Sequence, residues 1–222
     1  MHGESKMNKM KYIYGLILIL LIYFCMPVFS KPEIIVEKNG NVTNYRLAND
    51  PIKLAQDYQA LSREEKEKFI KEKVLAAGNA LPIHLIAMAD DIYLSKNGDA
   101  TAAVFFYLLG SLRGMQDSAS CEDKSAFAQV QIYPLLAQNT VQYMVNMDSK
   151  NLVNIANKVV EWDEKNTQRV SPQWACYHGM QAFYDDDVKI KPENERIKIQ
   201  KEIRESFIKS INKMEEAKQQ YK

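Results

Sequence analysis

The chain has 222 residues, of which 46% are hydrophobic, and its 29 basic side chains nearly balance 28 acidic ones to give a formal net charge of +1. This balance leaves no basic stripe, so composition argues against a nucleic-acid-binding protein. Glycine and proline are scarce, with 8 and 7 residues, and no β pattern repeats along the chain. A mainly helical protein is therefore expected.

The first 30 residues have the pattern of a secretory signal peptide. Several lysines precede an apolar run from Ile13 to Phe24, and Val28-Phe29-Ser30 suits the positions before a cleavage site. The run is shorter than the roughly 20 residues that span a bilayer. Cleavage before Lys31 and export to the periplasm are predicted, with no stable membrane span in the mature protein. An uncleaved leader that anchors the chain is the alternative.

Residues 31–50 are expected to form an N-terminal β-hairpin or an extended arm. Two short β-prone runs flank Asn39-Gly40, a pair typical of a two-residue hairpin turn. The signals after Asp50 are those of helices. Residues 51–222 are predicted to form one all-α domain of about seven helices, as a bundle or a short helical array.

Capping residues and prolines place the helix boundaries. Ser62 and Glu65 form a capping box, Asp99 and Asp148 each precede a helical pattern as N-caps, and Pro134 should kink or divide the helix that contains it. The predicted helices cover residues 62–78, 81–98, 99–117, 122–147, 148–166, a segment that begins at residues 171–172 and includes 174–180, and 192–221.

Two cysteines remain after the leader is removed, Cys121 and Cys176. An even pair in an exported protein favours a disulfide, because the compartment is oxidising. A nucleophilic Cys176 assisted by His178 is the alternative, but positions i and i+2 of a helix point to different faces. The segment Trp174-Ala175-Cys176-Tyr177-His178-Gly179-Met180 is therefore predicted to be a core helix tied to Cys121.

Residues 83–114 combine a helix, a turn at Gly98-Asp99 and a second helix rich in alanine and aromatic residues. This pattern is similar to a helix pair of the tetratricopeptide or Sel1-like repeats. No second copy follows at a fixed spacing, and stacked repeats need about three units for stability. The pattern predicts an antiparallel helical hairpin and no solenoid.

Three segments carry a wider resemblance: AAVFFYLLGSLRG (102–114), KVVEWDEKN (158–166) and WACYHGM (174–180). With the surroundings of Cys121, they resemble small exported bacterial all-helical proteins, some of which are periplasmic immunity proteins against toxins from rival bacteria. The resemblance implies a binding protein whose partner is another protein, most concretely a toxin. It carries over no site residue.

Catalytic and metal-binding patterns are not recognisable. After the leader the chain holds two histidines, His84 and His178, without zinc-ligand spacing. Nucleophile-elbow, phosphate-loop and dinucleotide motifs are missing, so no catalytic residue, metal or cofactor is expected. A cell-wall or metal-dependent hydrolase that uses His178 or aspartates such as the pair Asp90-Asp91 is a less favoured alternative, as is a cell-envelope adaptor built on residues 83–114.

Acidic side chains are the remaining candidates for a binding site. They form two groups along the chain. A solvated helix end would also account for such an acidic run. A calcium loop would be a further explanation, but its alternating pattern of acidic residues is missing. We expect these groups to meet a basic rim on a toxin and to occlude its active site. The candidate partner-binding residues are Asp185, Asp186, Asp187, Glu161, Asp163 and Glu164.

Overall fold

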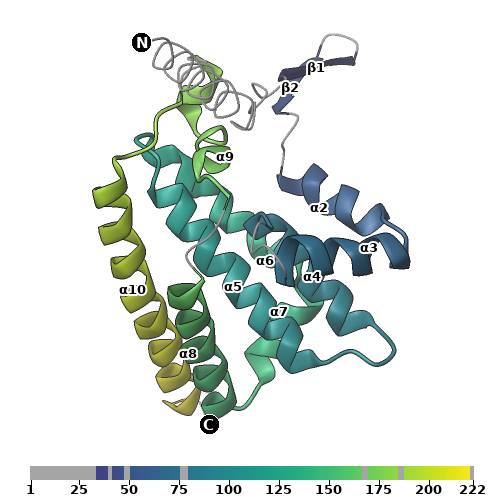
Figure 1. Cartoon of the computed structure of the whole chain (residues 1–222), viewed down its shortest axis with the longest axis vertical. Coiled ribbons are helices and arrows are strands. Elements are labelled where there is room, and N and C mark those ends of the chain that lie inside the picture. Colours follow the sequence, from purple (N-terminus) through teal and green to yellow (C-terminus); the bar gives the residue numbers. More distant parts are fainter. Residues whose placement is uncertain are drawn as a thin grey trace, which may run out of the picture. The chain divides into compact units, whose positions relative to one another are not determined.

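The computed structural model describes residues 34–39, 42–47, 51–75, 80–166, 170–184 and 188–220. The chain divides into two compact units, Met1–Lys31 and Pro32–Lys222. The first unit, and with it the predicted signal peptide, lies outside the described residues. In the described part of the second unit, helices follow one short hairpin, which confirms the all-α prediction (Figure 1).

The two strands β1 (Ile34–Asn39) and β2 (Val42–Leu47) form the predicted hairpin. They pair antiparallel, with Ile34 opposite Leu47 and Asn39 opposite Val42. Asn39 is thus the last paired residue of β1, whereas the sequence had placed it in the turn with Gly40.

The helical part begins with α2 (Pro51–Ala60) and α3 (Arg63–Phe69), which continues as the π-helix η1 (Ile70–Leu75). The capping box at the start of α3 is confirmed. Ser62 Oγ accepts a hydrogen bond from the backbone N–H of Glu65 at 3.3 Å, and the Glu65 carboxylate accepts one from the Ser62 N–H at 2.7 Å. These bonds satisfy two N–H groups that a helix start leaves unpaired.

Helices α4 (Pro82–Leu94) and α5 (Ala100–Ala119) form the predicted antiparallel hairpin. Asp99 caps α5 by accepting from the N–H groups of Thr101 and Ala102. Gly110 lets the helices approach closely, because a Cβ there would lie 2.8 Å from the Pro82 carbonyl oxygen and 2.7 Å from the Ile86 side chain. The second half of α5 therefore packs on the first turns of α4.

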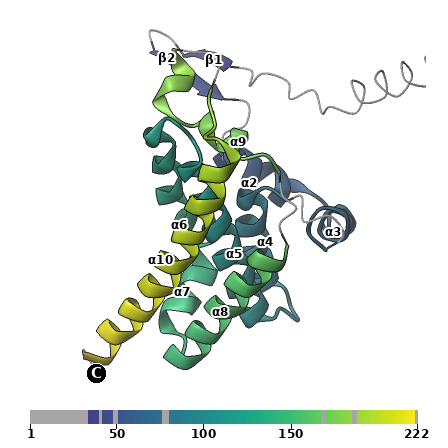
Figure 2. The same cartoon turned by 60° about the vertical axis from the view of Figure 1, so that its left-hand side comes forward.

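Helix α5 is the centre of the domain. Twelve of its 20 residues are buried, and it contacts α4, α7 (Gln138–Asn146), α8 (Ser149–Lys165) and α10 (Glu193–Gln220). In both views α4 and α10 lie on opposite sides of α5 (Figures 1 and 2). The core is contributed mainly by α4, α5 and α8.

Two predicted helices are broken into shorter pieces. The segment around Pro134 consists of the 3-10 helix η2 (Lys124–Ile132), the short α6 (Tyr133–Leu136) and α7, because Ala137 leaves the helical region with φ −141° and ψ 50°. The segment around Cys176 consists of α9 (Gln173–Cys176) and the 3-10 helix η3 (Met180–Phe183). The prediction of one helix there is wrong, because Gly179 is extended between them.

Candidate functional site

A disulfide joins Cys121, directly after α5, to Cys176 at the end of α9, as predicted. The two Cα atoms are 5.3 Å apart, and each residue is 1% exposed. Cys121 also forms an isolated antiparallel bridge with Ile190, ahead of α10. Three segments that are distant in sequence therefore meet at one buried point, and the Cys176 sulfur is engaged in a structural bond.

Trp174 packs beside this disulfide and is fixed by a buried acid. Its indole Nε1 donates a hydrogen bond to Asp117 Oδ2 at 2.9 Å, and the His178 ring meets the indole edge to face, with centroids 5.8 Å apart. A buried indole N–H needs such an acceptor. The segment from Trp174 to His178 is thus a piece of core, as its sequence indicates.

Two exposed segments are held together next to the disulfide. The Gln181 N–H donates to Asp123 Oδ2 and the Met180 N–H donates to Ser125 Oγ, both at 2.7 Å. The Ser125 hydroxyl, followed by the Gln181 N–H, lowers the pKa of Asp123. The contact is tight at Gly179, where a Cβ would lie 2.4 Å from Asp123 Oδ2. Helices η2 and η3 are therefore fixed relative to each other.

These two segments and the residue after η3 carry four exposed apolar side chains, which we call the apolar surface. The exposed fractions are 42% for Phe127, 57% for Met180, 50% for Phe183 and 84% for Tyr184. Single exposed apolar residues are ordinary, but aromatic residues and methionine are the types enriched in protein interfaces. Four of them on two short segments that hydrogen bonds hold together make this apolar surface the best candidate binding site in the described part of the chain.

The predicted acidic residues divide into three cases. Asp185, Asp186 and Asp187 follow Tyr184 directly in sequence but lie outside the described residues. Glu161 and Glu164 are exposed on α8, where Glu161 pairs with Lys165. Asp163 is 1% exposed, so the structure corrects its assignment to a partner-binding surface.

Asp163 instead belongs to a buried cluster of charged side chains. Its Oδ1 lies 2.8 Å from Arg113 Nε, and its Oδ2 lies 2.8 Å from Arg204 Nη2 and 3.0 Å from Gln116 Nε2. The Arg113 guanidinium also covers the Trp162 ring, at 4.9 Å from the ring centroid. This cluster connects α5, α8 and α10. Sequence reasoning missed it, although Arg113 on an apolar helix was a signal that a buried acid had to be nearby.

Asp90 and Asp91, which are adjacent on α4, interact with different residues. Asp90 Oδ1 accepts from the Thr140 N–H at 2.8 Å and from the Thr140 hydroxyl at 3.0 Å, and Asp90 Oδ2 accepts from Asn139. Asp91 pairs with Lys66 at 2.7 Å. Asp90 therefore caps α7 from another helix, because the N-cap residue Ala137 has no side chain that can do so.

His84 lies in an aromatic environment on α4. Its ring meets Phe69 edge to face at 5.0 Å between centroids, with Tyr58 at 6.5 Å. Burial lowers the pKa of His84 from 6.5 to about 4. The half-buried imidazole is therefore neutral at physiological pH and packs against the rings of Phe69 and Tyr58.

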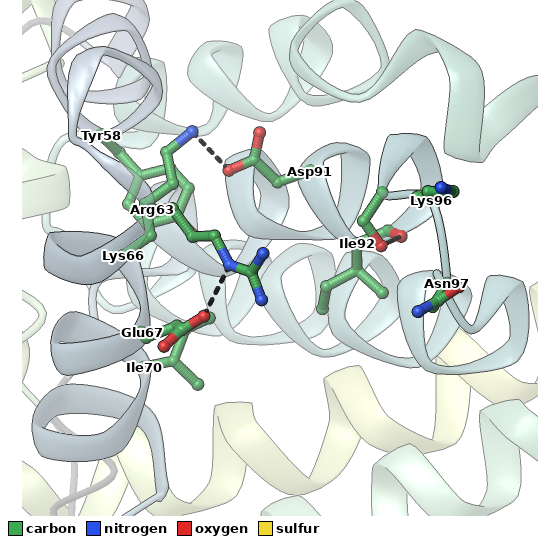
Figure 3. Close-up of a pocket in the computed structure, with 10 residues that line it drawn as sticks. Tyr58, Arg63, Lys66, Glu67, Ile70, Asp91, Ile92, Lys96 and Asn97 are labelled. Carbon is green, nitrogen blue, oxygen red and sulfur yellow. Dashed lines mark hydrogen bonds and ion pairs between the residues drawn. The ribbon is translucent and has the colours of Figure 1, made fainter.

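A cavity of about 530 Å³ opens next to Tyr58 (Figure 3). One wall comes from α2, α3 and η1, and the other from the end of α4 and the turn after it. The lining residues are Tyr58, Arg63, Lys66, Glu67, Ile70, Asp91, Ile92, Ser95, Lys96 and Asn97. Both polar and apolar groups face this space.

Among the described residues, no helix is long and apolar enough to cross a membrane, and no group of three or more histidine, cysteine or acidic side chains is placed to hold a metal ion. Comparison with known proteins gives no relative: no family model, curated protein or solved structure matches this chain. Its function has to be argued from its own residues.

Proposed function

We propose that this chain is an exported, disulfide-stabilised helical protein of the periplasm that binds another protein. Most concretely, it is an immunity protein that occludes an antibacterial toxin. The observation that carries the proposal is the apolar surface of Phe127, Met180, Phe183 and Tyr184, which is presented on a frame fixed by the disulfide and by the hydrogen bonds of Asp123 and Ser125.

Export rests on the leader and on the cysteines. The N-terminal pattern is that of a signal peptide, and a buried disulfide between Cys121 and Cys176 is the form that an oxidising compartment favours. Together they favour the periplasm over a reducing compartment.

The rigidity of the apolar surface favours binding. A partner that docks on a backbone already held in place by hydrogen bonds loses less conformational entropy than one that must order a loop. Exposed aromatic side chains of this kind act as anchors that enter pockets on the partner. Tyr184, at 84% exposed, offers both a ring and a hydroxyl for that purpose.

The sequence next to this surface indicates the charge of the partner. Asp185, Asp186 and Asp187 add three negative charges directly after Tyr184. A complementary partner would present a basic rim around an apolar pocket, as expected at the active site of a toxin that acts on a polyanion. Such complementarity chiefly raises the association rate. Occlusion of that active site would be the mechanism of immunity.

The test is capture of the tagged, exported protein from a periplasmic extract, with mass spectrometry of the bait and of the retained proteins. The proposal expects a bait that begins at Lys31 with an intact disulfide, and one stoichiometric partner with a basic surface. Retention should fall as salt rises and should be weaker, because association is slower, when Asp185, Asp186 and Asp187 are changed to Asn. A matched control changes the exposed acids Glu161 and Glu164 to Gln.

Two results would overturn the proposal. One is a bait with free thiols that retains its leader. The other is a partner that the wild-type chain and the aspartate variant retain in the same amount and with the same salt dependence. Retention of an endogenous envelope complex would favour the adaptor alternative, for which the α4–α5 hairpin is the supporting feature.

A further inference from the structure

The cavity between α3 and the end of α4 lies outside the apolar surface, and its residues have no part in the proposed function. Its volume of about 530 Å³ falls within the range of roughly 300 to 1,000 Å³ that is usual for small-molecule sites. Its composition shows which class of ligand it suits.

The apolar part of the lining comes from Ile70, Ile92 and the ring of Tyr58. Tyr58 is 3% exposed, and its hydroxyl is buried without a hydrogen-bond partner among the described residues. Burial, together with the nearby Asp91 carboxylate, raises the pKa of Tyr58, so the hydroxyl stays protonated and able to donate. A hydroxyl oxygen without accessible surface cannot contact a ligand in this space, so Tyr58 contributes only the apolar part of its side chain to the lining.

The charged part of the lining has a positive surplus. Three cationic side chains, Arg63, Lys66 and Lys96, face two carboxylates, Glu67 and Asp91. Both carboxylates are engaged: Glu67 Oε1 lies 2.9 Å from Arg63 Nε, and Asp91 Oδ2 lies 2.7 Å from Lys66 Nζ.

Two cationic groups keep donors for a ligand. Figure 3 shows the end of the Arg63 guanidinium directed away from Glu67 and towards the side of Ile92. Lys96 makes no ion pair within the part of the chain that the structure describes. The C-terminus of α4 would repel a bound anion, because a helix C-terminus carries partial negative charge. Lys96, two residues beyond Leu94, offsets that charge.

We propose that this cavity binds a small amphipathic anion, with one carboxylate or phosphate monoester head on an apolar body. Lys96 and the free end of the Arg63 guanidinium contact the head. Ile70, Ile92 and the ring of Tyr58 contact the body. The guanidinium fork suits either head, because both offer two oxygens at matching spacing.

The test uses four probes of similar length: octanoate, octyl phosphate, octanol and octylammonium. Each is titrated into the isotope-labelled mature protein, and binding is followed by amide chemical shifts and by calorimetry. The proposal expects saturable binding of an anionic probe, with shifts confined to the cavity lining and affinity that falls as salt rises. Octanoate against octyl phosphate distinguishes the two head groups.

Variants of the lining make the result specific. Arg63→Gln combined with Lys96→Gln should weaken anion binding at least tenfold, whereas Tyr58→Phe, which removes only the buried hydroxyl, should leave it unchanged. Lys150→Gln, an exposed lysine outside the lining, is the matched control and should bind as the wild type does.

Three results would overturn the inference. The first is that neither anionic probe binds saturably, and the second is that octylammonium binds more tightly than octanoate. The third is that the double variant binds the anionic probe as tightly as the wild type does. None of them bears on protein binding at the apolar surface, so the two proposals can fail separately.

Discussion

Arg113 Nε lies 2.8 Å from Asp163 Oδ1, and the two side chains are only 3% and 0% exposed. Arg204 on α10 reaches the other oxygen of the same carboxylate. The Arg113 guanidinium and the Asp163 carboxylate are thus removed from water at the junction of three helices, with the partly buried Arg204 beside them. Charges in such a place are tolerated only while they are paired.

Replacement of Asp163 should therefore be severely destabilising. Asp163→Asn keeps the size of the side chain but leaves Arg113 and Arg204 without their negative partner, and we expect a loss of about 3–5 kcal/mol in the free energy of unfolding. Denaturant unfolding followed by circular dichroism measures it. Glu161→Gln on the exposed face of the same helix should cause a much smaller loss, because an exposed ion pair contributes little to stability. Equal effects at both positions would rule out the buried cluster as a source of stability.

The disulfide should contribute a comparable amount. Its cysteines are 55 residues apart, and in the chain-entropy model removal of a bridge of that length costs about 4 kcal/mol. Cys121→Ser combined with Cys176→Ser should lower the free energy of unfolding by that order. The wild-type chain in a reductant should approach the stability of this variant, whereas the reductant should leave the variant itself unchanged. A reductant effect on the variant would point to another cause.

His84 should make stability depend on pH in a defined window. Above pH 6.5 the imidazole is neutral in both states, so it has no effect. Between pH 6.5 and about 4 the unfolded chain takes up a proton that the folded chain excludes. The free energy of unfolding therefore decreases by up to about 3 kcal/mol as the pH is lowered through this window. His84→Leu should remove this part of the pH dependence. If the wild type and the variant show parallel profiles from pH 7 to 4, His84 is not buried as described.

Asp90 should matter more than Asp91 although the two are adjacent. Asp90→Ala removes the acceptor for the Thr140 N–H and hydroxyl, and hydrogen bonds to a charged group contribute about 1.5–3 kcal/mol. Asp91→Ala removes a partly exposed ion pair with Lys66, which should cost under about 1 kcal/mol. Hydrogen exchange should also show faster opening of α7 in the Asp90 variant alone. Unchanged exchange in α7 would argue against its cap.

Local features of the fold were predictable, because they depend on neighbours in sequence. The capping box of Ser62 and Glu65 and the N-caps Asp99 and Asp148 are recognised within four residues. The pairing of Cys121 with Cys176 needed only the leader and the count of cysteines. The antiparallel packing of α4 and α5 followed from the short turn and the small residues on α5.

Features that depend on distant contacts were not predictable. Asp163 lies four residues after Val159 on the buried face of α8, but its partners Arg113 and Arg204, 50 and 41 residues away, could not be identified from the sequence. The end of α9 depends on Asp123, whose side chain holds the segment after Gly179. The exposure of Phe183 and Tyr184 has no signature in the sequence, because aromatic residues are more often part of a core.

The most direct measurement of the central claim is the dissociation constant of the purified partner for the wild-type protein and for Phe183→Ala combined with Tyr184→Ala. Loss of two interface anchors should weaken binding at least 100-fold, with unchanged unfolding. Leu94→Ala, a residue 63% exposed at the end of α4, should leave the dissociation constant within about twofold. If the double variant binds as tightly as the wild type, the apolar surface is not the binding site.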